Sequence, residues 1–380
     1  MISGFTTTGA TFVSDVEGLT KGSLFWRSFS HWIGGMGVLV FLLAIVPMAG
    51  GSHMNLMKAE SPGPSVGKLV PKVRQTAKYL YIIYFALTMI EVIFLLFGGM
   101  NLFEALTTSF GTAGTGGFAI WNDGFVSVSP YNQWVVTIFM LLFGVNFGFY
   151  FLILTGKLRD ALKFEEVRIY FIIVIAAAVF IFINLRHFAL YAPAEGIRQA
   201  FFQVASIITT TGFASADFNL WPETSRTILV LLMFIGACAG STGGGIKVSR
   251  FIIACKSFIK EIISYLHPRS VKKIKIEGKP LEIGRVRATN VYFMTYMVIF
   301  AVSVLLVSIE NKDLVTNFAA VAATFNNIGP GLSLVGPMAN FGHFTDFTKY
   351  ILMFDMLAGR LEIFPMMLLF CPAVWKRRRA

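Results

Sequence analysis

The segment Thr209-Thr210-Thr211-Gly212-Phe213 decides the fold, because three other parts of the chain repeat its pattern of small polar residues around one glycine. The three repeats are Thr6-Thr7-Thr8-Gly9-Ala10, Gly114-Thr115-Gly116-Gly117-Phe118 and Asn326-Asn327-Ile328-Gly329-Pro330. Each segment is followed by a short polar stretch and then by a long apolar one. Four polar glycine loops in an otherwise apolar chain predict four loops that meet on one axis, which is how an ion filter is built.

The composition indicates a membrane protein. Of the 380 residues, 56% are hydrophobic and only 14% are charged, whereas soluble domains carry about 25% charged residues. Apolar runs of about 20 residues, long enough to cross the hydrocarbon core as helices, recur along the chain. They cover residues 23–46, 79–97, 134–154, 169–185, 227–239, 292–307 and 350–369. We therefore expect an all-α, multi-pass membrane protein.

The distribution of the positive charge indicates topology. The net charge is +12, and most Lys and Arg residues fall in four segments, 47–78, 156–168, 250–287 and 376–379. Cytoplasmic loops carry an excess of cations, so we expect these segments on the cytoplasmic side and the glycine loops on the outer side. Docking to a cytoplasmic partner is the alternative explanation for the same residues. Nucleic acid is not an expected partner.

Each glycine loop is expected to belong to a repeat of an outer helix, a short pore helix, the loop itself and an inner helix. Four such repeats, related by pseudo-symmetry, would surround one central pore. They are assigned to residues 1–50, 77–156, 168–265 and 288–376, with a basic cytoplasmic linker at 266–287. The inner helices of repeats two and four are expected to cover about 131–155 and 345–375.

Repeat one is incomplete, because the chain reaches its first glycine loop at Thr6. The outer and short helices that precede the other three loops are missing from it. Irregular backbone at membrane depth is tolerated only where protein or a water-filled cavity surrounds it. We therefore expect either an N-terminal truncation or a misassigned start codon.

Local signals mark where the short helices begin. Asn101, followed three residues later by Glu104, is typical of a helix N-cap with a capping box. Pro193 and Glu195 suit the first turn of the short helix in repeat three. The short helix of repeat four is expected to begin near Asp313.

The loops carry the chemistry that a monovalent-cation filter needs. Backbone carbonyls can replace the water shell of a dehydrated cation, and glycine permits the positive φ that turns a carbonyl inward. The four loops contain no carboxylate, which favours carbonyl ligands over the acidic ring expected for divalent cations. The alternative, that each segment is only a turn between helices, is disfavoured by four segments in register.

Inner helix three is interrupted at 236–245, which reads Gly-Ala-Cys-Ala-Gly-Ser-Thr-Gly-Gly-Gly. Each glycine costs about 1 kcal/mol relative to alanine inside a helix, so this run disfavours an unbroken helix. A phosphate-binding loop is disfavoured because Ile246 and Lys247 follow where Lys and then Ser or Thr are required. A simple helix kink and a movable barrier beneath the filter remain.

Arg360 is a charge in an otherwise apolar inner helix, and such a residue usually faces a cavity or a partner. It follows the glycine of loop four by as many residues as Gly243 follows that of loop three, so we expect both at similar depth. The alternative is a salt bridge to Asp355 or Glu362. Glu91, alone in outer helix two, is expected to be a packing or hydrogen-bonded residue rather than an ion site.

The chain resembles the Trk/Ktr/HKT superfamily of potassium transporters from Ile2 to its C-terminus. The motifs that carry the resemblance lie at 3–11, 209–213, 239–247, 267–269 and 326–331. The resemblance implies that carbonyls at and before one glycine per repeat bind K⁺, the transported ion. The implied ion-binding residues are Thr7, Thr8, Gly9, Thr115, Gly116, Gly117, Thr210, Thr211, Gly212, Asn327, Ile328 and Gly329. One glycine per loop makes a short filter, so we expect modest selectivity with some passage of Na⁺ or Rb⁺.

The resemblance also implies a gate and partners. The implied gate residues are Gly240, Ser241, Thr242, Gly243, Gly244, Gly245, Lys247 and Arg360. Family members form homodimers in the bacterial plasma (inner) membrane, contact its lipids, and dock on a cytoplasmic nucleotide-binding ring that is TrkA-like. No organic cofactor is expected in this chain.

Two other function classes are considered. An ion-coupled transporter of an organic substrate also uses broken helices, but it predicts inverted repeats rather than four repeats of one orientation. A membrane enzyme is disfavoured because the histidines are scattered and form no catalytic set or metal motif. They are His31, His53, His187, His267 and His343.

Overall fold

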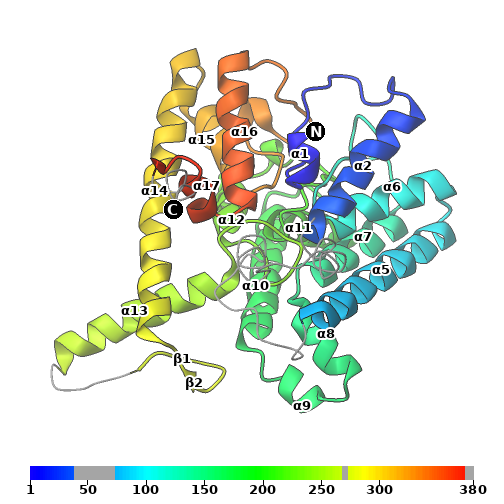
Figure 1. Ribbon diagram of the computed structural model, residues 1–380. Helices are drawn as coiled ribbons and strands as arrows, with labels where there is room; N and C mark the ends of the chain where they lie inside the picture. Colours follow the sequence, from blue (N-terminus) through cyan, green and yellow to red (C-terminus); the bar gives the residue numbers. More distant parts are fainter. Residues whose placement is uncertain (38–72, 268–272, 373–380) are drawn as a thin grey trace.

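A computed structural model describes residues 1–37, 73–267 and 273–372 (Figure 1). In this part of the chain the fold is helical apart from one short antiparallel hairpin, which lies in the basic linker. The hairpin pairs β1 (Lys275–Ile276) with β2 (Lys279–Pro280). Some predicted features extend beyond the described residues. They are the inner helix of repeat one past residue 37, the inner helix of repeat four past residue 372, the basic segments at 47–72 and 376–379, and residues 268–269 of one motif.

Repeat two contains α5 (Val73–Phe97), α6 (Leu102–Ala113), α7 (Pro130–Phe143) and α8 (Phe147–Leu154), and the short α9 (Leu158–Ala161) follows it. The predicted capping box is confirmed at the start of α6. The side chain of Asn101 accepts a bond from the Glu104 amide at 3.0 Å, and the Glu104 carboxylate accepts one from the Asn101 amide at 3.1 Å. Local polar signals thus set where the pore helix begins.

The inner helix expected over 131–155 is not continuous. It breaks at residues 144–146, and α7 and α8 meet at an angle of 88°. The backbone groups freed by the break are bonded by repeat three: Gly144 accepts from the Cys238 amide at 3.0 Å, and the Phe147 amide donates to Gly240 at 2.9 Å. The break therefore exists because another repeat supplies its hydrogen bonds.

Repeat three contains α10 (Glu165–His187), α11 (Pro193–Ile208), the 3₁₀ turn η2 (Phe218–Leu220), α12 (Glu223–Ile235) and α13 (Val248–Leu266). Pro193 is the first residue of α11 and Glu195 lies in its first turn, as predicted. The predicted interruption of the inner helix is confirmed and covers residues 236–247, which we call the intramembrane loop. Figure 1 shows α13 leading away from the helix bundle after this loop.

Repeat four contains α14 (Ile283–Val307), α15 (Leu314–Phe325), α16 (Asp346–Arg360) and α17 (Ile363–Leu368), with 3₁₀ turns η3 (Ser308–Glu310) and η4 (Ser333–Val335). Asp313 caps α15, because its carboxylate accepts bonds from the Thr316 amide at 2.9 Å and the Thr316 hydroxyl at 2.6 Å. These bonds lower the pKa of Asp313.

The inner helix expected over 345–375 breaks directly after Arg360. Glu362 adopts a φ of 66°, which a continuing α-helix does not allow. Its carboxylate pairs with Arg250 of α13 at 2.6 Å. The expectation of one long helix was therefore wrong, and the break coincides with a tertiary ion pair.

Repeat one contains α1 (Ile2–Phe5) and α2 (Lys21–Gly35). The expectation that it lacks the short helix altogether needs correction, because α1 is a single helical turn that ends at the first glycine loop, where the other loops have their pore helices. Its backbone bonds, such as the one from the Thr6 amide to Ile2 at 2.9 Å, give the loop the same helical support.

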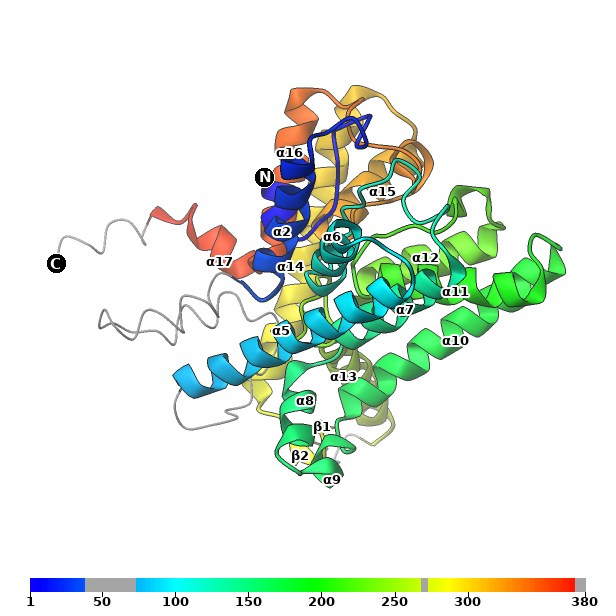
Figure 2. The same cartoon turned by 90° about the vertical axis from the view of Figure 1, so that its right-hand side faces the viewer.

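The four repeats pack in cyclic order. In each repeat the helix after the loop contacts the pore helix of the next: α2 packs on α6, α7 on α11, α12 on α15, and α16 on α1. Figure 2 shows the second of these pairs side by side, and Figure 1 places α1 between α16 and α2. The last contact closes the ring between the two ends of the described chain.

Among the described helices, three are long and apolar enough to cross a membrane. They are Lys78–Phe97, Glu165–His187 and Ile283–Glu310, and α7 with α8 adds a fourth if the bent pair is one span. These helices leave large apolar side chains on their outer faces, such as Phe85 and Met294. A hydrocarbon surrounding accounts for such exposure, and the chain is a multi-pass membrane protein.

Candidate functional site

The four glycine loops share one unusual backbone conformation. We number them loop one (6–10), loop two (114–118), loop three (209–213) and loop four (326–330). In each loop, φ is positive at the glycine and also at the residue two positions before it. That residue is Thr7, Thr115, Thr210 or Asn327, with φ of 54°, 52°, 58° and 56°. A β-branched threonine rarely adopts this conformation, so its recurrence in three loops is a strained feature that these loops share.

The positive φ arises because each loop terminates its helix with a Schellman motif. In loop three, the Thr211 amide donates to Ser206 at 2.9 Å and the Thr210 amide donates to Ile207 at 3.1 Å. The first of these bonds recurs in the other loops, from Thr8 to Ser3, Gly116 to Gly111 and Ile328 to Ala323, at 2.9, 2.9 and 2.8 Å. Glycine usually occupies the left-handed position of this motif, but here threonine or asparagine does.

The four loops close into a ring in which each glycine faces a carbonyl oxygen of the next loop. A Cβ atom on Gly9 would lie 2.1 Å from the carbonyl oxygen of Gly116, and one on Gly117 would lie 2.0 Å from that of Thr211. A Cβ atom on Gly212 would lie 1.9 Å from the carbonyl oxygen of Ile328, and one on Gly329 would lie 2.6 Å from that of Thr8. Each carbonyl belongs to the residue just before a loop glycine. Only glycine fits these positions, because both the positive φ and the close approach exclude a side chain.

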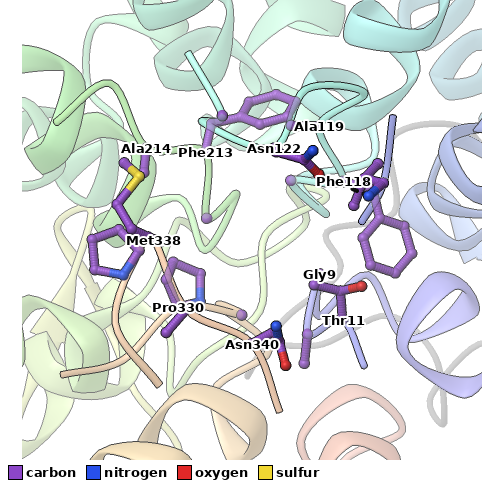
Figure 3. Close-up of a pocket in the computed structure, with 18 of the residues that line it drawn as sticks. Gly9, Thr11, Phe118, Ala119, Asn122, Phe213, Ala214, Pro330, Met338 and Asn340 are labelled. Atoms are coloured by element: carbon purple, nitrogen blue, oxygen red, sulfur yellow. Dashed lines mark hydrogen bonds between the residues drawn. The ribbon is translucent and has the colours of Figure 1, made fainter. Parts of the chain in front are cut away.

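One opening lies over this ring. The glycine of every loop lines it, together with Thr11, Phe118, Asn122 and Asn340. Figure 3 shows the residues from the four repeats arranged around the opening, with the loops converging on it. Every residue that the sequence predicts for ion binding lies in this ring of four loops.

The intramembrane loop packs against the opposite, inner side of the same ring. The Gly244 amide donates to the hydroxyl of Thr210 at 2.5 Å, and the hydroxyl of Thr115 donates to the carbonyl of Thr242 at 3.0 Å. Two of the three threonines with positive φ thus hold this loop. A Cβ on Gly244 would also lie 2.7 Å from the carbonyl oxygen of Asn326, which leaves no space between the loops.

Arg360 connects the intramembrane loop to repeat one. Its Nη1 donates to the Thr242 carbonyl at 2.8 Å, and its Nη2 donates to the carbonyls of Gly35, at 2.9 Å, and Gly34. The sequence prediction that Arg360 and the loop lie at one depth agrees with these bonds. Of its proposed salt-bridge partners, Glu362 pairs with Arg250 at 2.6 Å. Asp355 accepts a bond from Ser303 at 2.7 Å.

A buried acid binds the intramembrane loop and the first turn of the helix that follows it. Oε1 of Glu166 accepts a bond from the Ala239 amide at 2.7 Å and another from the Ser249 amide at 3.0 Å. Lys247 is almost completely buried, has a φ of 83°, and donates to the carbonyl of Gly243. The loop is therefore held by a carboxylate outside it and by a lysine inside it.

Sequence reasoning missed Glu166 and Arg250, and it considered Glu362 only as a partner of Arg360 rather than of Arg250. The available signal for Glu166 was a pair of acids, Glu165 and Glu166, at the start of a span. This signal does not indicate that one of them bonds to a loop in another part of the chain. Of the remaining predicted gate residues, Gly240 bonds to Phe147 of repeat two. Ser241 bonds within the loop to Cys238 at 2.7 Å, and Gly243 and Gly245 lie in the same segment. Glu91 is fully buried in α5 and does not line the opening.

Comparison with known proteins identifies relatives over nearly the whole chain. The family model described as "TrkH: Cation transport protein" matches residues 1–377. The chain is 38% identical over 383 residues to the Trk system potassium uptake protein TrkH of Escherichia coli (strain K12), covering 98% of this chain and 78% of that protein. It is 32% identical over 381 residues to the Trk system potassium uptake protein TrkG of the same organism, covering 99% and 78%.

A solved structure is similar in fold as well as in sequence. The crystal structure of the potassium transporter TrkH from Vibrio parahaemolyticus matches with a TM-score of 0.86 and 34% sequence identity. The match covers 98% of this chain and 77% of that one.

Proposed function

Because the chain belongs to the TrkH family of cation transport proteins, we propose that it conducts K⁺ into a bacterial cell across the inner membrane. It acts as the ion-conducting subunit of a Trk-type uptake system. The observation that carries this proposal is the closed ring of four glycine loops, each with the same left-handed backbone and with a carbonyl at each contact. Carbonyl rings are the ligands that replace the water shell of K⁺.

In this proposal the filter ligands are the carbonyls of the two residues that precede each of the four loop glycines. The paired positions are Thr7 and Thr8, Thr115 and Gly116, Thr210 and Thr211, and Asn327 and Ile328. Positive φ at each loop glycine and two positions before it supports the assignment, because this conformation can turn a backbone carbonyl inward, toward the pore axis. The filter is short and only approximately fourfold, so it passes some Na⁺ or Rb⁺ beside K⁺.

The intramembrane loop is the gate of the proposed pore. It lies directly against the ring, and Arg360 adds a positive charge at the same level. Conduction requires the loop to leave this position, which breaks its bonds to Thr210, Thr115 and Arg360. Glycine-rich backbone suits this movement because it adopts several conformations at little cost.

The repeats assigned from the sequence are the units of the proposed pore, and the assembly includes partners. The chain functions as a homodimer within membrane lipids and docks on a cytoplasmic ring that binds nucleotides, as the Trk-type system implies. Basic residues in α13 and in the β1–β2 hairpin, such as Lys256 and Lys275, support the predicted cytoplasmic side as the docking surface.

The test is rescue of a bacterium that lacks its own K⁺ uptake systems. The chain should restore growth on low K⁺ and K⁺ uptake by washed cells. The variant Gly212→Ala should not, because its Cβ would collide with the Ile328 carbonyl at 1.9 Å in a backbone with φ of 83°. Absence of uptake by the unaltered chain, when it is present in the membrane, would overturn the proposal.

A further inference from the structure

His31 of α2 contacts repeat one and repeat two with a single side chain. The imidazole is fully buried, and its Nδ1 lies 2.9 Å from the carbonyl oxygen of Gly4 in α1. Nδ1 therefore carries a proton, since a carbonyl oxygen only accepts. On its other side the ring lies against Phe118 of loop two, with centroids 4.2 Å apart. The ring thus lies between the helix that supports loop one and the backbone of loop two.

The imidazole also explains why loop two differs in sequence from the others. A Cβ on Gly116 would lie 2.2 Å from both Cγ and Nδ1 of His31. The backbone of Gly116 is not among those with positive φ, so it has no conformational need for glycine. The equivalent positions in the other loops carry side chains, those of Thr8, Thr211 and Ile328. His31 therefore fills the space that a side chain of loop two would otherwise take.

This packing fixes a carbonyl of the ring. The carbonyl oxygen of Gly116 meets Gly9 of loop one, where a Cβ would lie only 2.1 Å away. Gly116 is thus held by Gly9 on one side and by the imidazole on the other. Protein interiors are close-packed, so a void behind Gly116 releases it to move.

The contacts between other neighbouring loops are made differently. Loops four and one are joined directly, by the bond from Asn327 Nδ2 to the hydroxyl of Thr8 at 3.0 Å. Repeats two and three are joined by the Phe125 amide, which donates to the Ala214 carbonyl at 2.8 Å. At the contact between loops one and two, a side chain from outside both loops provides the support.

We propose that His31 is a specificity-determining positioning residue for ion selection, and that Gly116 is its steric partner. The imidazole sets the position of the Gly116 carbonyl in the ring and thereby the size of the site offered to the ion. This inference rests on the proposed filter function of the four loops. Replacing His31 changes which ions pass, and a side chain introduced at position 116 compensates for the lost imidazole.

The experiment measures uptake of K⁺, Rb⁺ and Na⁺ by proteoliposomes containing the full chain, each normalised to the inserted protein. His31→Ala should lower the ratio of K⁺ to Na⁺ uptake by roughly two- to tenfold, which is the lower part of the range for coupled contacting residues. Gly116→Thr alone should lose most uptake, because the new side chain collides with the imidazole. The double variant, which gives loop two the threonine of loop three, should recover both uptake and the ion ratio.

Two results would overturn the inference. One is an unchanged ion ratio in His31→Ala, since a residue that is only structural lowers all three fluxes equally. The other is additivity, in which the double variant is worse than either single one. If His31→Ala does not insert, His31→Asn replaces it, with the same expectation for the ratio and for rescue by Gly116→Thr.

A control at another contact separates this inference from the filter proposal. Gly212→Ser alters the contact between loops three and four and should change or abolish selective uptake. If it does so while the His31 variants keep the wild-type ion ratio, the filter stands and the role of His31 fails. If Gly212→Ser also leaves uptake and ion ratio unaltered, the filter proposal itself fails.

Discussion

Arg250 and Glu362 form an ion pair that joins two broken inner helices: Nη2 of Arg250 lies 2.6 Å from Oε2 of Glu362. Arg250 lies in the first turn of α13, after the intramembrane loop, and Glu362 lies at the break between α16 and α17. The guanidinium also stacks on Tyr292 at 3.9 Å. The pair therefore couples the segment that follows the proposed gate to the helix that carries Arg360.

Breaking this pair should destabilise the protein. The two side chains are only 10% and 13% exposed, and removing one partner of a buried pair typically costs about 3–5 kcal/mol. Glu362→Gln should therefore lower the midpoint of thermal unfolding in detergent. Asp346→Asn is the matched control, because Asp346 pairs with Lys349 but is 88% exposed, and such a surface pair is worth roughly 0–1 kcal/mol. Equal effects of the two variants would contradict the role given to the buried pair.

Removing Arg360 should raise the leak of the closed pore. Arg360→Ala deletes the bonds to Thr242 and Gly35 and removes the positive charge at the proposed gate. Conductance of single proteins in planar bilayers is the measurement. Arg360→Lys keeps the charge but cannot make all of the bonds, so its leak should be intermediate. Unchanged or lower flux in Arg360→Ala would remove the gating role.

Glu166 should act on the gate through its acceptor oxygen rather than through its volume. Glu166→Ala leaves the amides of Ala239 and Ser249 without their partner, and each buried unpaired group costs about 1–3 kcal/mol. The intramembrane loop should then detach more readily and the open probability should rise. Glu166→Gln retains one acceptor oxygen and should stay closer to wild type. A Gln variant that is as open as the Ala variant would argue against this explanation.

Thr210 and Thr7 allow a comparison between equivalent positions. Both have positive φ, but only the hydroxyl of Thr210 bonds to the intramembrane loop, through the Gly244 amide. The hydroxyl of Thr7 is buried and has no hydrogen-bond partner among the described residues. Valine keeps the shape of threonine at either position and removes the hydroxyl. Thr210→Val should increase open probability more than Thr7→Val, as measured in the same bilayer recordings; the reverse order would show that this bond does not hold the gate closed.

Short-range chemistry explains which parts of the fold could be predicted. Asn101 with Glu104, and Pro193 at the start of α11, identify the pore-helix starts, because a cap is formed by residues within one turn of each other. The role of the glycines in the four loops could be predicted for the same reason, because positive φ is a local backbone requirement that glycine meets without steric cost.

The two unpredicted helix breaks have causes that are distant in the sequence. The segment at 144–146 reads as part of an apolar helix, but at its break Cys238 bonds to the carbonyl of Gly144 and Gly240 accepts a bond from the Phe147 amide. The break after Arg360 likewise occurs where Glu362 turns toward Arg250. A pattern of apolar residues contains no information about which other segment will supply a hydrogen bond.

The sequence by itself determined that the protein has four glycine loops, three of them preceded by short helices, an interrupted inner helix and an arginine in an apolar helix. Only the tertiary structure decided that the loops close in cyclic order, that Arg360 reaches Thr242, and that His31 takes the space of a side chain at Gly116. The physical reason is the distance along the sequence over which each interaction acts. Backbone conformation and capping depend on adjacent residues, whereas the ring depends on packing between segments that become neighbours only when the chain folds.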